Sequence, residues 1–133
     1  MKPREKDLAD RILVLAVART QLLCDGLSAL IRSEPDMELA GTTVAADVAV
    51  QMFLESTPQV TLIDLDLPDH SGIAAIQRIR ASDPAARIVG MLMDEWDEVG
   101  RAALRAGAWS CVRKDRLTTD LPAAIRRSCG KTP

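Results

Sequence analysis

The chain has 133 residues, which allows one domain able to bury roughly two thirds of its unfolded surface and leaves no room for a second. Apolar residues make up 47% of the chain and charged residues 27%, as in ordinary globular proteins. The net charge of −2 excludes a broad basic surface for nucleic acid, and the scarcity of aromatic residues argues against a base-stacking surface. If the protein acts on DNA, we expect another segment to make the contacts.

Three cysteines lie at wide spacings, at Cys24, Cys111 and Cys129, without any C-x-x-C pair. This pattern predicts neither a disulfide framework nor a zinc site, and it indicates packed thiols in a reducing cytoplasm. The first residues are charged, and no apolar run approaches about 20 residues. We therefore expect a cytoplasmic protein with no signal peptide and no membrane span.

Five strand-like runs alternate with five amphipathic stretches, which is the pattern of a parallel sheet with helices on both faces. The strands are expected at residues 12–17, 37–42, 60–64, 87–92 and 109–112. The helices are expected at residues 19–33, 45–56, 73–80, 94–106 and 119–129. The first strand is apolar throughout, which predicts a central position, whereas polar alternation in the second predicts an edge.

Right-handed crossovers reduce the possible topologies to a few, of which the flavodoxin-like strand order 2-1-3-4-5 is the natural one. We therefore predict an α/β fold with a doubly wound five-stranded parallel sheet and five helices. The folded domain is expected over residues 11–129, between a polar leader at 1–10 and the start of a linker or tail at 130–133. In this order the ends of the first, third and fifth strands meet at one edge.

Local signals refine the helices. Thr20 is a candidate cap for the first helix, and Thr119 opens the last helix with Pro122 in its first turn. Gly26 lies inside the first helix, which we interpret as a place where helix and sheet approach closely. The acidic residues 94–98 suit the amino end of the fourth helix, where negative charge is favoured.

An apolar run delivers the carboxylate of Asp64 to the end of the third strand, and Pro68 then turns the chain. In open α/β sheets the ligand crevice lies outside these strand ends. A strand-end aspartate is also common as a turn or capping residue, so the position alone leaves both interpretations open. The topology brings Ala18, Arg19 and Lys114 to the same edge. An aspartate beside a lysine suits an acyl-phosphate site, in which the carboxylate attacks phosphorus and the ammonium holds a phosphoryl oxygen.

Five short segments carry a family resemblance that runs from about residue 11 to 129. They are D-G-L at 25–27, E-P-D-M-E-L-A-G from Glu34, I-D-L-D-L-P-x-x-x-G from Ile63, L-R-A-G-A from Leu104 and V-R-K-D from Val112. With these segments the chain resembles the receiver domains of bacterial two-component response regulators, in the NarL/FixJ-like (LuxR-type) subgroup. The resemblance implies a CheY-like fold, with Asp64 as the phosphoacceptor and Lys114 as the lysine that contacts the phosphoryl group.

The chain departs from that family at four positions. Ala18 and Arg19 replace the acidic pair that, with the phosphoacceptor, binds Mg²⁺ in a receiver. Leu92 replaces the Ser or Thr that reports phosphorylation, and Cys111 replaces the aromatic residue that moves with it. We therefore expect Mg²⁺ binding to be lost or weak, no other metal or cofactor, and no normal phosphorylation, because phosphoryl transfer depends on the metal.

The remaining polar residues near the site have simple interpretations. The guanidinium of Arg19 either pairs with Asp64, in place of the missing cation, or points into solvent, and both remain open. Asp66 is expected to be a solvated charge and His70 a surface residue. Asp94 and Glu95 serve the helix end and are a weak metal candidate. Cys111 is expected to be packed rather than reactive.

Three functions compete. The first is an atypical receiver domain of a DNA-binding response regulator, a homodimer that responds to a sensor kinase or a small-molecule ligand and reaches DNA only through a C-terminal helix-turn-helix outside this chain. A stand-alone pseudo-receiver that acts through protein contacts is the runner-up. Neither is an enzyme. The least favoured is a haloacid-dehalogenase-like phosphatase, with Asp64 as nucleophile and Asp66 as general acid.

Overall fold

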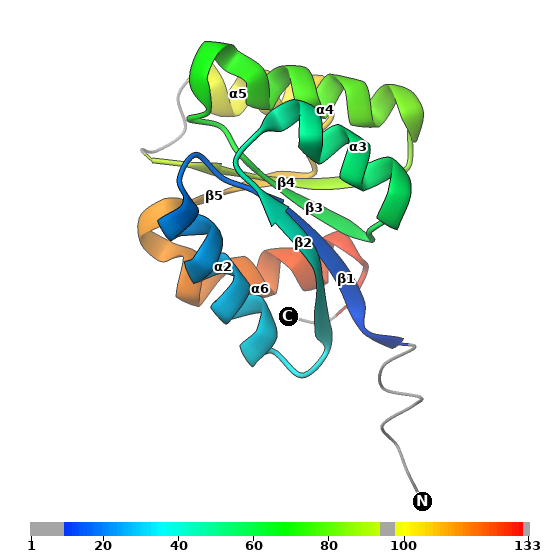
Figure 1. Cartoon of the computed structure of the whole chain (residues 1–133), viewed down its shortest axis with the longest axis vertical. Coiled ribbons are helices and arrows are strands. Elements are labelled where there is room, and N and C mark those ends of the chain that lie inside the picture. The colour runs from blue at the N-terminus through cyan, green and yellow to red at the C-terminus, as the bar shows by residue number, and fades with distance from the viewer. Residues whose placement is uncertain (1–9, 94–97, 132–133) are drawn as a thin grey trace, which may run out of the picture.

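Five parallel strands form one sheet in the order β2-β1-β3-β4-β5, as predicted. The strands are β1 (Ile12–Val17), β2 (Met37–Thr43), β3 (Val60–Asp64), β4 (Arg87–Leu92) and β5 (Ser110–Arg113). The helices are α2 (Gln21–Ser33), α3 (Ala46–Ser56), α4 (Ser71–Ser82), α5 (Glu98–Ala106) and α6 (Leu117–Ser128), with short 3₁₀ turns η1 (Pro68–His70) and η2 (Lys114–Arg116). These bounds come from a computed structural model, which describes residues 10–93 and 98–131 (Figure 1).

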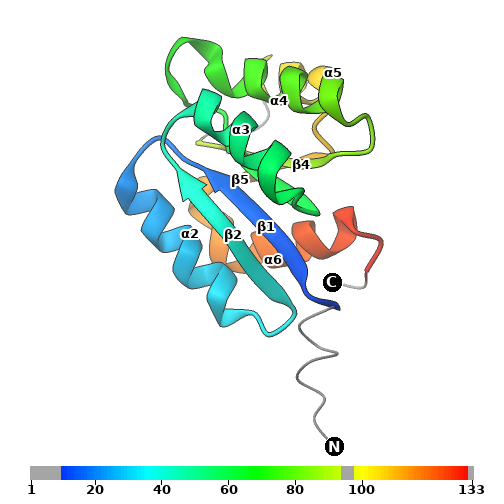
Figure 2. The same ribbon diagram turned by 45° about the vertical axis from the view of Figure 1, so that its right-hand side comes forward.

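The helices cover both faces of the sheet, with α2 and α6 on one side and α3, α4 and α5 on the other (Figures 1 and 2). Alternate residues of each strand enter the two cores. In β1, Val14 and Ala16 face α2 and α6, whereas Leu15 and Val17 face the other three helices. β1 is an interior strand beside the central β3, and it is apolar throughout because helices cover both of its faces. The predicted CheY-like fold is confirmed.

The strand register aligns the carboxyl ends of neighbouring strands. Val17 of β1 pairs with Ile63 of β3, and Asp64 pairs with Met91 of β4. Because parallel strands share a direction, the loops after β1, β3 and β5 emerge at the same edge of the sheet. This carboxyl edge carries the candidate site.

Two local predictions need correction, and one is confirmed. Thr20 caps α2, since its Oγ1 accepts a hydrogen bond from the amide of Leu23 at 3.1 Å. Gly26 does not mark a close approach to the sheet, because a Cβ built on it meets no atom within 4 Å. The last helix begins at Leu117, so Pro122 lies inside it rather than in its first turn. Its buried ring removes one helical hydrogen bond and packs into the core instead.

The opposite, amino-terminal edge of the sheet holds an ion-pair cluster that the sequence analysis missed. Arg126 of α6 donates two hydrogen bonds to Asp36, both at 2.9 Å, and a third to Glu34. The bonds from Arg126 lower the pKa of Asp36, and the two carboxylates raise the pKa of Arg126. The cluster joins the last helix to the turn before β2, across about 90 residues of sequence.

No helix within residues 10–93 and 98–131 has the length and apolar character needed to cross a membrane. None of the three cysteines forms a disulfide with another described residue, and Cys24 is buried. Burial raises the pKa of the Cys24 thiol, which fits the expected role of a small packed hydrophobe.

Candidate functional site

Asp64 ends β3 and has no exposed surface. Its Oδ2 accepts a hydrogen bond from the backbone amide of Arg19 at 2.8 Å, and its Oδ1 accepts one from the amide of Asp66 at 2.9 Å. The ammonium of Lys114 lies 2.7 Å from Oδ1. A carboxylate can be buried only when it is paired and hydrogen-bonded, and here both oxygens have partners.

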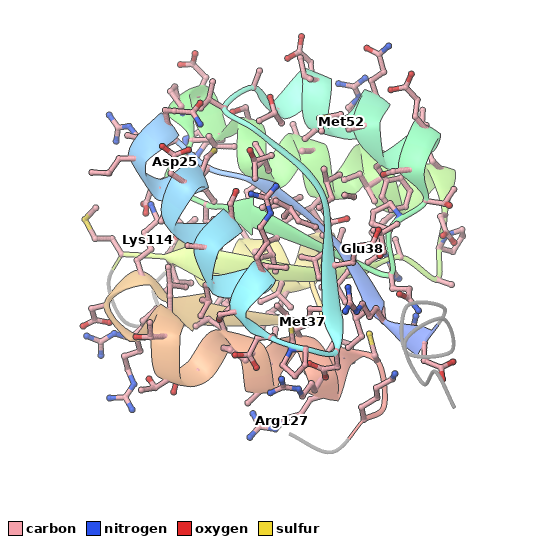
Figure 3. All side chains as sticks on the ribbon, turned by 60° about the horizontal axis from the view of Figure 1, so that its bottom comes forward. Asp25, Met37, Glu38, Met52, Lys114 and Arg127 are labelled. Carbon is pink, nitrogen blue, oxygen red and sulfur yellow. The ribbon has the colours of Figure 1, made fainter. Side chains whose placement is uncertain are left out.

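Lys114 follows β5 directly, at the start of η2, and its side chain is 16% exposed. Its ammonium contacts two carboxylates at once, Oδ1 of Asp64 at 2.7 Å and Oδ2 of Asp66 at 2.9 Å. Figure 3 shows Lys114 and Asp25 of α2 on the same side of the molecule, away from Arg127 near the end of α6. Asp64 and Lys114 thus meet at the carboxyl edge, as predicted.

Asp66 corrects the expectation of a solvated charge. The chain turns immediately after β3, so the side chain two residues beyond Asp64 folds back under the same ammonium. Its side chain is 32% exposed, and its carboxylate is a member of the site. Asp64, Lys114 and Asp66 thus form a compact cluster, which we call the carboxyl-edge triad.

The two positions of the missing acidic pair have different environments. Ala18 has no exposed surface, packs in the core under α2 and donates its amide to the carbonyl of Thr43 at 3.1 Å. Arg19 is exposed, and it contacts Asp64 only through its backbone amide. The ion pairs between described residues include none from the Arg19 guanidinium, so of the two interpretations left open the pairing with Asp64 is excluded. The peptide N–H makes the contact while the charged side chain stays hydrated, as the alternative expected.

Leu92 and Cys111 lie on the opposite side of the sheet from α6. Leu92 is 4% exposed and belongs to the core under α3, α4 and α5. Cys111 is half-buried against the same core, as expected of a packed thiol. Gly90 makes room there, because a Cβ at Gly90 would lie 2.9 Å from Leu65 Cδ1 and 3.1 Å from Cys111 Sγ. Neither position offers the hydroxyl or the aromatic ring that a receiver of the usual kind carries.

The loop after Asp64 is tightly constrained. Asp69 and His70 both have positive φ, at 59° and 56°, and His70 is exposed as predicted. Gly72 then lets α4 begin against the end of β3, since a Cβ there would lie 2.6 Å from the Asp64 carbonyl oxygen. The spacing between the phosphoacceptor position and this glycine is therefore a packing requirement of the site.

The side chains that surround Asp64 do not fit Mg²⁺. Magnesium needs about six oxygen ligands in near-octahedral array, whereas Ala18 provides none and Lys114 takes the space between the two carboxylates. Within the described ranges, no three histidine, cysteine or acidic residues lie close enough to hold a metal. The weak candidates Asp94 and Glu95 lie outside the described residues.

The sequence pattern of the response regulator receiver domain family matches residues 14–126 of this chain. The chain belongs to this family. It is 32% identical over 120 residues to the transcriptional regulatory protein MctR of Rhizobium johnstonii, which covers 90% of this chain and 56% of MctR. It is 31% identical over 110 residues to a protein-glutamate methylesterase/protein-glutamine glutaminase of Cupriavidus pinatubonensis, covering 82% of this chain and 31% of that enzyme.

Two solved structures show the same architecture. The response regulator domain of Thermotoga maritima CheB superposes with a TM-score of 0.83 at 27% identity, over 92% of this chain and 99% of that one. A LuxR-family response regulator from an Aurantimonas species gives 0.84 at 28% identity, over 92% and 88%. This chain is therefore a receiver domain with LuxR-family relatives, and membership sets aside the haloacid-dehalogenase alternative. The chain spans only about half of MctR, and less of the methylesterase.

Proposed function

We propose that this chain is an atypical receiver domain of a DNA-binding response regulator, in which Asp64 is not phosphorylated by the usual magnesium-dependent route. The observation that carries the proposal is that the two positions after β1 supply no carboxylate, since Ala18 is buried in the core and the exposed Arg19 contacts Asp64 only through its backbone amide. Among the described residues, the ammonium of Lys114 is then the cation that balances Asp64 and Asp66. The domain then works through dimerisation or through another ligand.

Charge counting supports this proposal. Two carboxylates and one ammonium give the carboxyl-edge triad a net charge of −1. Phosphorylation would replace the −1 charge of the Asp64 carboxylate by the roughly −1.5 to −2 charge of a phosphoryl group. Without a bound cation, this phosphoryl group and Asp66 would share one ammonium in a largely buried pocket, where like charges repel strongly. The triad is therefore poorly suited to accept a phosphoryl group.

Access to Asp64 supports it further. Both of its oxygens already accept hydrogen bonds, and the residue has no exposed surface. A carboxylate nucleophile needs a free lone pair in line with the phosphorus it attacks. Oδ1 already has two partners, Lys114 and the amide of Asp66, so a phosphodonor would have to approach Oδ2, which accepts the amide of Arg19.

The two residues that would respond to phosphorylation in the family are also replaced in this chain. Leu92 is an apolar core residue with no hydroxyl to turn toward a phosphoryl group, and Cys111 is packed over Gly90 with no aromatic ring to move. Both positions favour one packed arrangement rather than two. We infer that a chemical change at Asp64 does not switch the domain to a second conformation.

The relatives suggest the context of this domain. MctR is named a transcriptional regulatory protein, and the chain spans 56% of its length, so DNA contacts would come from a segment beyond the receiver. A sensor kinase or a small molecule remains the proposed source of the signal, and a homodimer the proposed assembly. A stand-alone pseudo-receiver acting through protein contacts is the second candidate, and the length of the natural protein separates the two.

The test is phosphorylation by acetyl phosphate with Mg²⁺, followed by intact mass. We expect no phosphoryl adduct on the wild-type protein, and an adduct on the Ala18→Asp/Arg19→Asp variant, because the two acids rebuild the metal site. Adding Asp64→Asn to that variant should remove the adduct and so identify the modified residue. Efficient labelling of Asp64 in the wild-type protein would refute the proposal.

A further inference from the structure

A groove of about 380 Å³ lies between the amino ends of α3 and α4. One side of it is formed by residues 44–47, in the β2–α3 loop and the first turn of α3, and the other by residues between Leu67 and Arg78. The two helices pack against each other in the layer that covers the face of the sheet away from α6 (Figures 1 and 2). Most of the lining side chains are apolar. One end of the groove is therefore the loop that directly follows Asp66 of the carboxyl-edge triad.

Three charged side chains line the groove without a counter-ion. Asp47 of α3, Asp69 of η1 and Arg78 of α4 are all exposed. None of them takes part in an ion pair between described residues. The carboxylate of Asp47 accepts a hydrogen bond from the amide of the next residue, Val48, at 3.0 Å. Charges of both signs on one groove can therefore pair with an incoming surface without breaking an existing ion pair.

Large apolar side chains are exposed beside the same groove. Val44 lines it and is exposed. Leu54 is also exposed, and it lies two turns beyond Asp47 on the same side of α3. On the other side of the sheet, the described residues of α2 and α6 include one large exposed apolar side chain, Leu22. Apolar groups that gather at the surface in this way are typical of a protein contact.

The charges of the groove favour a second copy of this chain as the occupant. A wholly acidic surface would be repelled by Asp47 and Asp69, and a wholly basic one by Arg78. A two-fold axis places the same surface against itself in the reverse direction. Asp69 and Arg78 are nine residues apart, and the small, exposed Ala74 lies near their midpoint. An axis at Ala74 therefore brings each Arg78 to Asp69 of the partner subunit.

We propose that two copies of this chain pair through the α3–α4 groove, with their α4 helices antiparallel and crossing at Ala74. Each Arg78 then lies against Asp69 of the partner subunit, and the exposed apolar groups beside the groove are covered. This interface rests on the proposed function, which includes a homodimer, and it gives that homodimer a contact surface. Because Asp69 follows Asp66 by three residues, one loop carries members of both the site and the interface.

Sedimentation equilibrium of the whole chain over a range of concentrations tests the pairing. We expect a reversible dimer for the wild type, and a dissociation constant raised tenfold or more by Arg78→Glu, because the two-fold axis repeats each repulsion. Asp69→Lys should weaken the dimer in the same way. An equimolar mixture of the two variants should restore it, since both contacts of the mixed dimer then join opposite charges. The matched control Arg32→Glu, on the last turn of α2, should leave the dissociation constant unchanged.

The outcomes separate this interface from the proposed function. A wild-type protein that stays monomeric would overturn both the interface and the homodimer, and would leave the claim about phosphorylation standing. A wild-type dimer that Arg78→Glu leaves intact, or a mixture that restores nothing, would overturn the α3–α4 interface and keep the homodimer.

Disulfide trapping then locates the two-fold axis. In a background with Cys111→Ala and Cys129→Ala, we expect Ala74→Cys to form a covalent dimer under mild oxidation, because the two thiols meet at the axis. The matched control is Ala29→Cys, at an exposed position of α2, which should stay monomeric under the same conditions. Efficient trapping at position 29, or equal trapping at both positions, would contradict pairing through α4.

Discussion

The two edges of the sheet each hold one cation between two carboxylates, but the environments of the two clusters differ. In the carboxyl-edge triad, Asp64 has no exposed surface and accepts two backbone amides besides Lys114. At the amino edge, Arg126 and its partners Glu34 and Asp36 have side chains that are 20%, 23% and 38% exposed. At the amino edge these charges join α6 to the turn before β2 near the protein surface. At the carboxyl edge the same kinds of charge surround a carboxylate that is fully buried. Burial and backbone donors, rather than the number of charges, distinguish the carboxyl-edge triad from the amino-edge cluster.

The largest expected effect comes from Lys114→Met. The substitution leaves the Asp64 carboxylate buried without a counter-ion, and breaking a buried pair in this way typically costs about 3–5 kcal/mol. The two backbone amides that remain should keep the loss near 3 kcal/mol. Urea unfolding measures it, with Lys131→Met as an exposed control expected to change stability by less than about 0.5 kcal/mol.

Combining Lys114→Met with Asp64→Asn sharpens this result. Removing the negative charge together with the ammonium should recover most of the lost stability, because the double variant buries no unpaired ion. Additive losses in this cycle would mean that Lys114 and Asp64 are not coupled.

A smaller loss, about 1–2 kcal/mol, is expected from Arg126→Met, since the pairs at this edge are partly exposed and partly screened by water. The effect should depend on pH. Arg126 lowers the pKa of Asp36 in the folded state, so its stabilising contribution is complete above the unfolded value of about 3.9 and disappears as the pH falls through the lower folded value.

Denaturation of wild type and Arg126→Met at several pH values checks this. The stability difference should be constant above about pH 5 and shrink in strongly acidic solution. A difference that grew as the pH fell would contradict the assignment of the pair.

A modest gain, about 0.5–1 kcal/mol, is expected from Gly26→Ala. Gly26 is exposed in the middle of α2 with no atom near its Cβ position, and alanine is the better helix former. The matched Gly72→Ala should be destabilising, because its methyl group would lie 2.6 Å from the Asp64 carbonyl oxygen. The change in melting temperature of the two variants compares an exposed position of α2 with the position where α4 packs against the end of β3.

The smallest effect should come from the strained loop beside the site. Asp69→Gly relieves a positive φ of 59° but gives the unfolded chain more freedom, so we expect a gain of about 0.5 kcal/mol or less. Asp83→Gly, at the extended cap of α4, should instead lose stability, since it removes the side-chain bond to the Ala85 amide. Equal losses from both would show that the loop is not strained.

The sequence predicted the fold because strand and helix periods alternate without ambiguity, and the strand order then placed Asp64 and Lys114 at one edge. It missed the contact between Asp66 and Lys114. The direction of a side chain two residues beyond a strand depends on the conformation of the following turn, which the sequence does not specify. The Arg126 cluster joins residues some 90 positions apart, and no local pattern indicates such a pair.

Gly26 was misinterpreted because Leu23 and Leu30 lie at helical spacing from it in the sequence. The structure shows that the buried stripe of α2 is Cys24, Leu27 and Ile31, which leaves position 26 outside it. The backbone amide of Arg19, in contrast, has no sequence signature, because every residue at that position except proline would offer the same donor to Asp64.

The central claim is that a lysine ammonium, and not a divalent ion, is the cation of the carboxyl edge. Titration of the wild-type protein and the Ala18→Asp/Arg19→Asp variant with MgCl₂, followed by NMR on the amides of Arg19, Asp64 and Asp66, tests it most directly. We expect no saturable shift in the wild type and saturable binding in the millimolar range in the variant. Saturable magnesium binding at Asp64 of the wild-type protein would contradict the account.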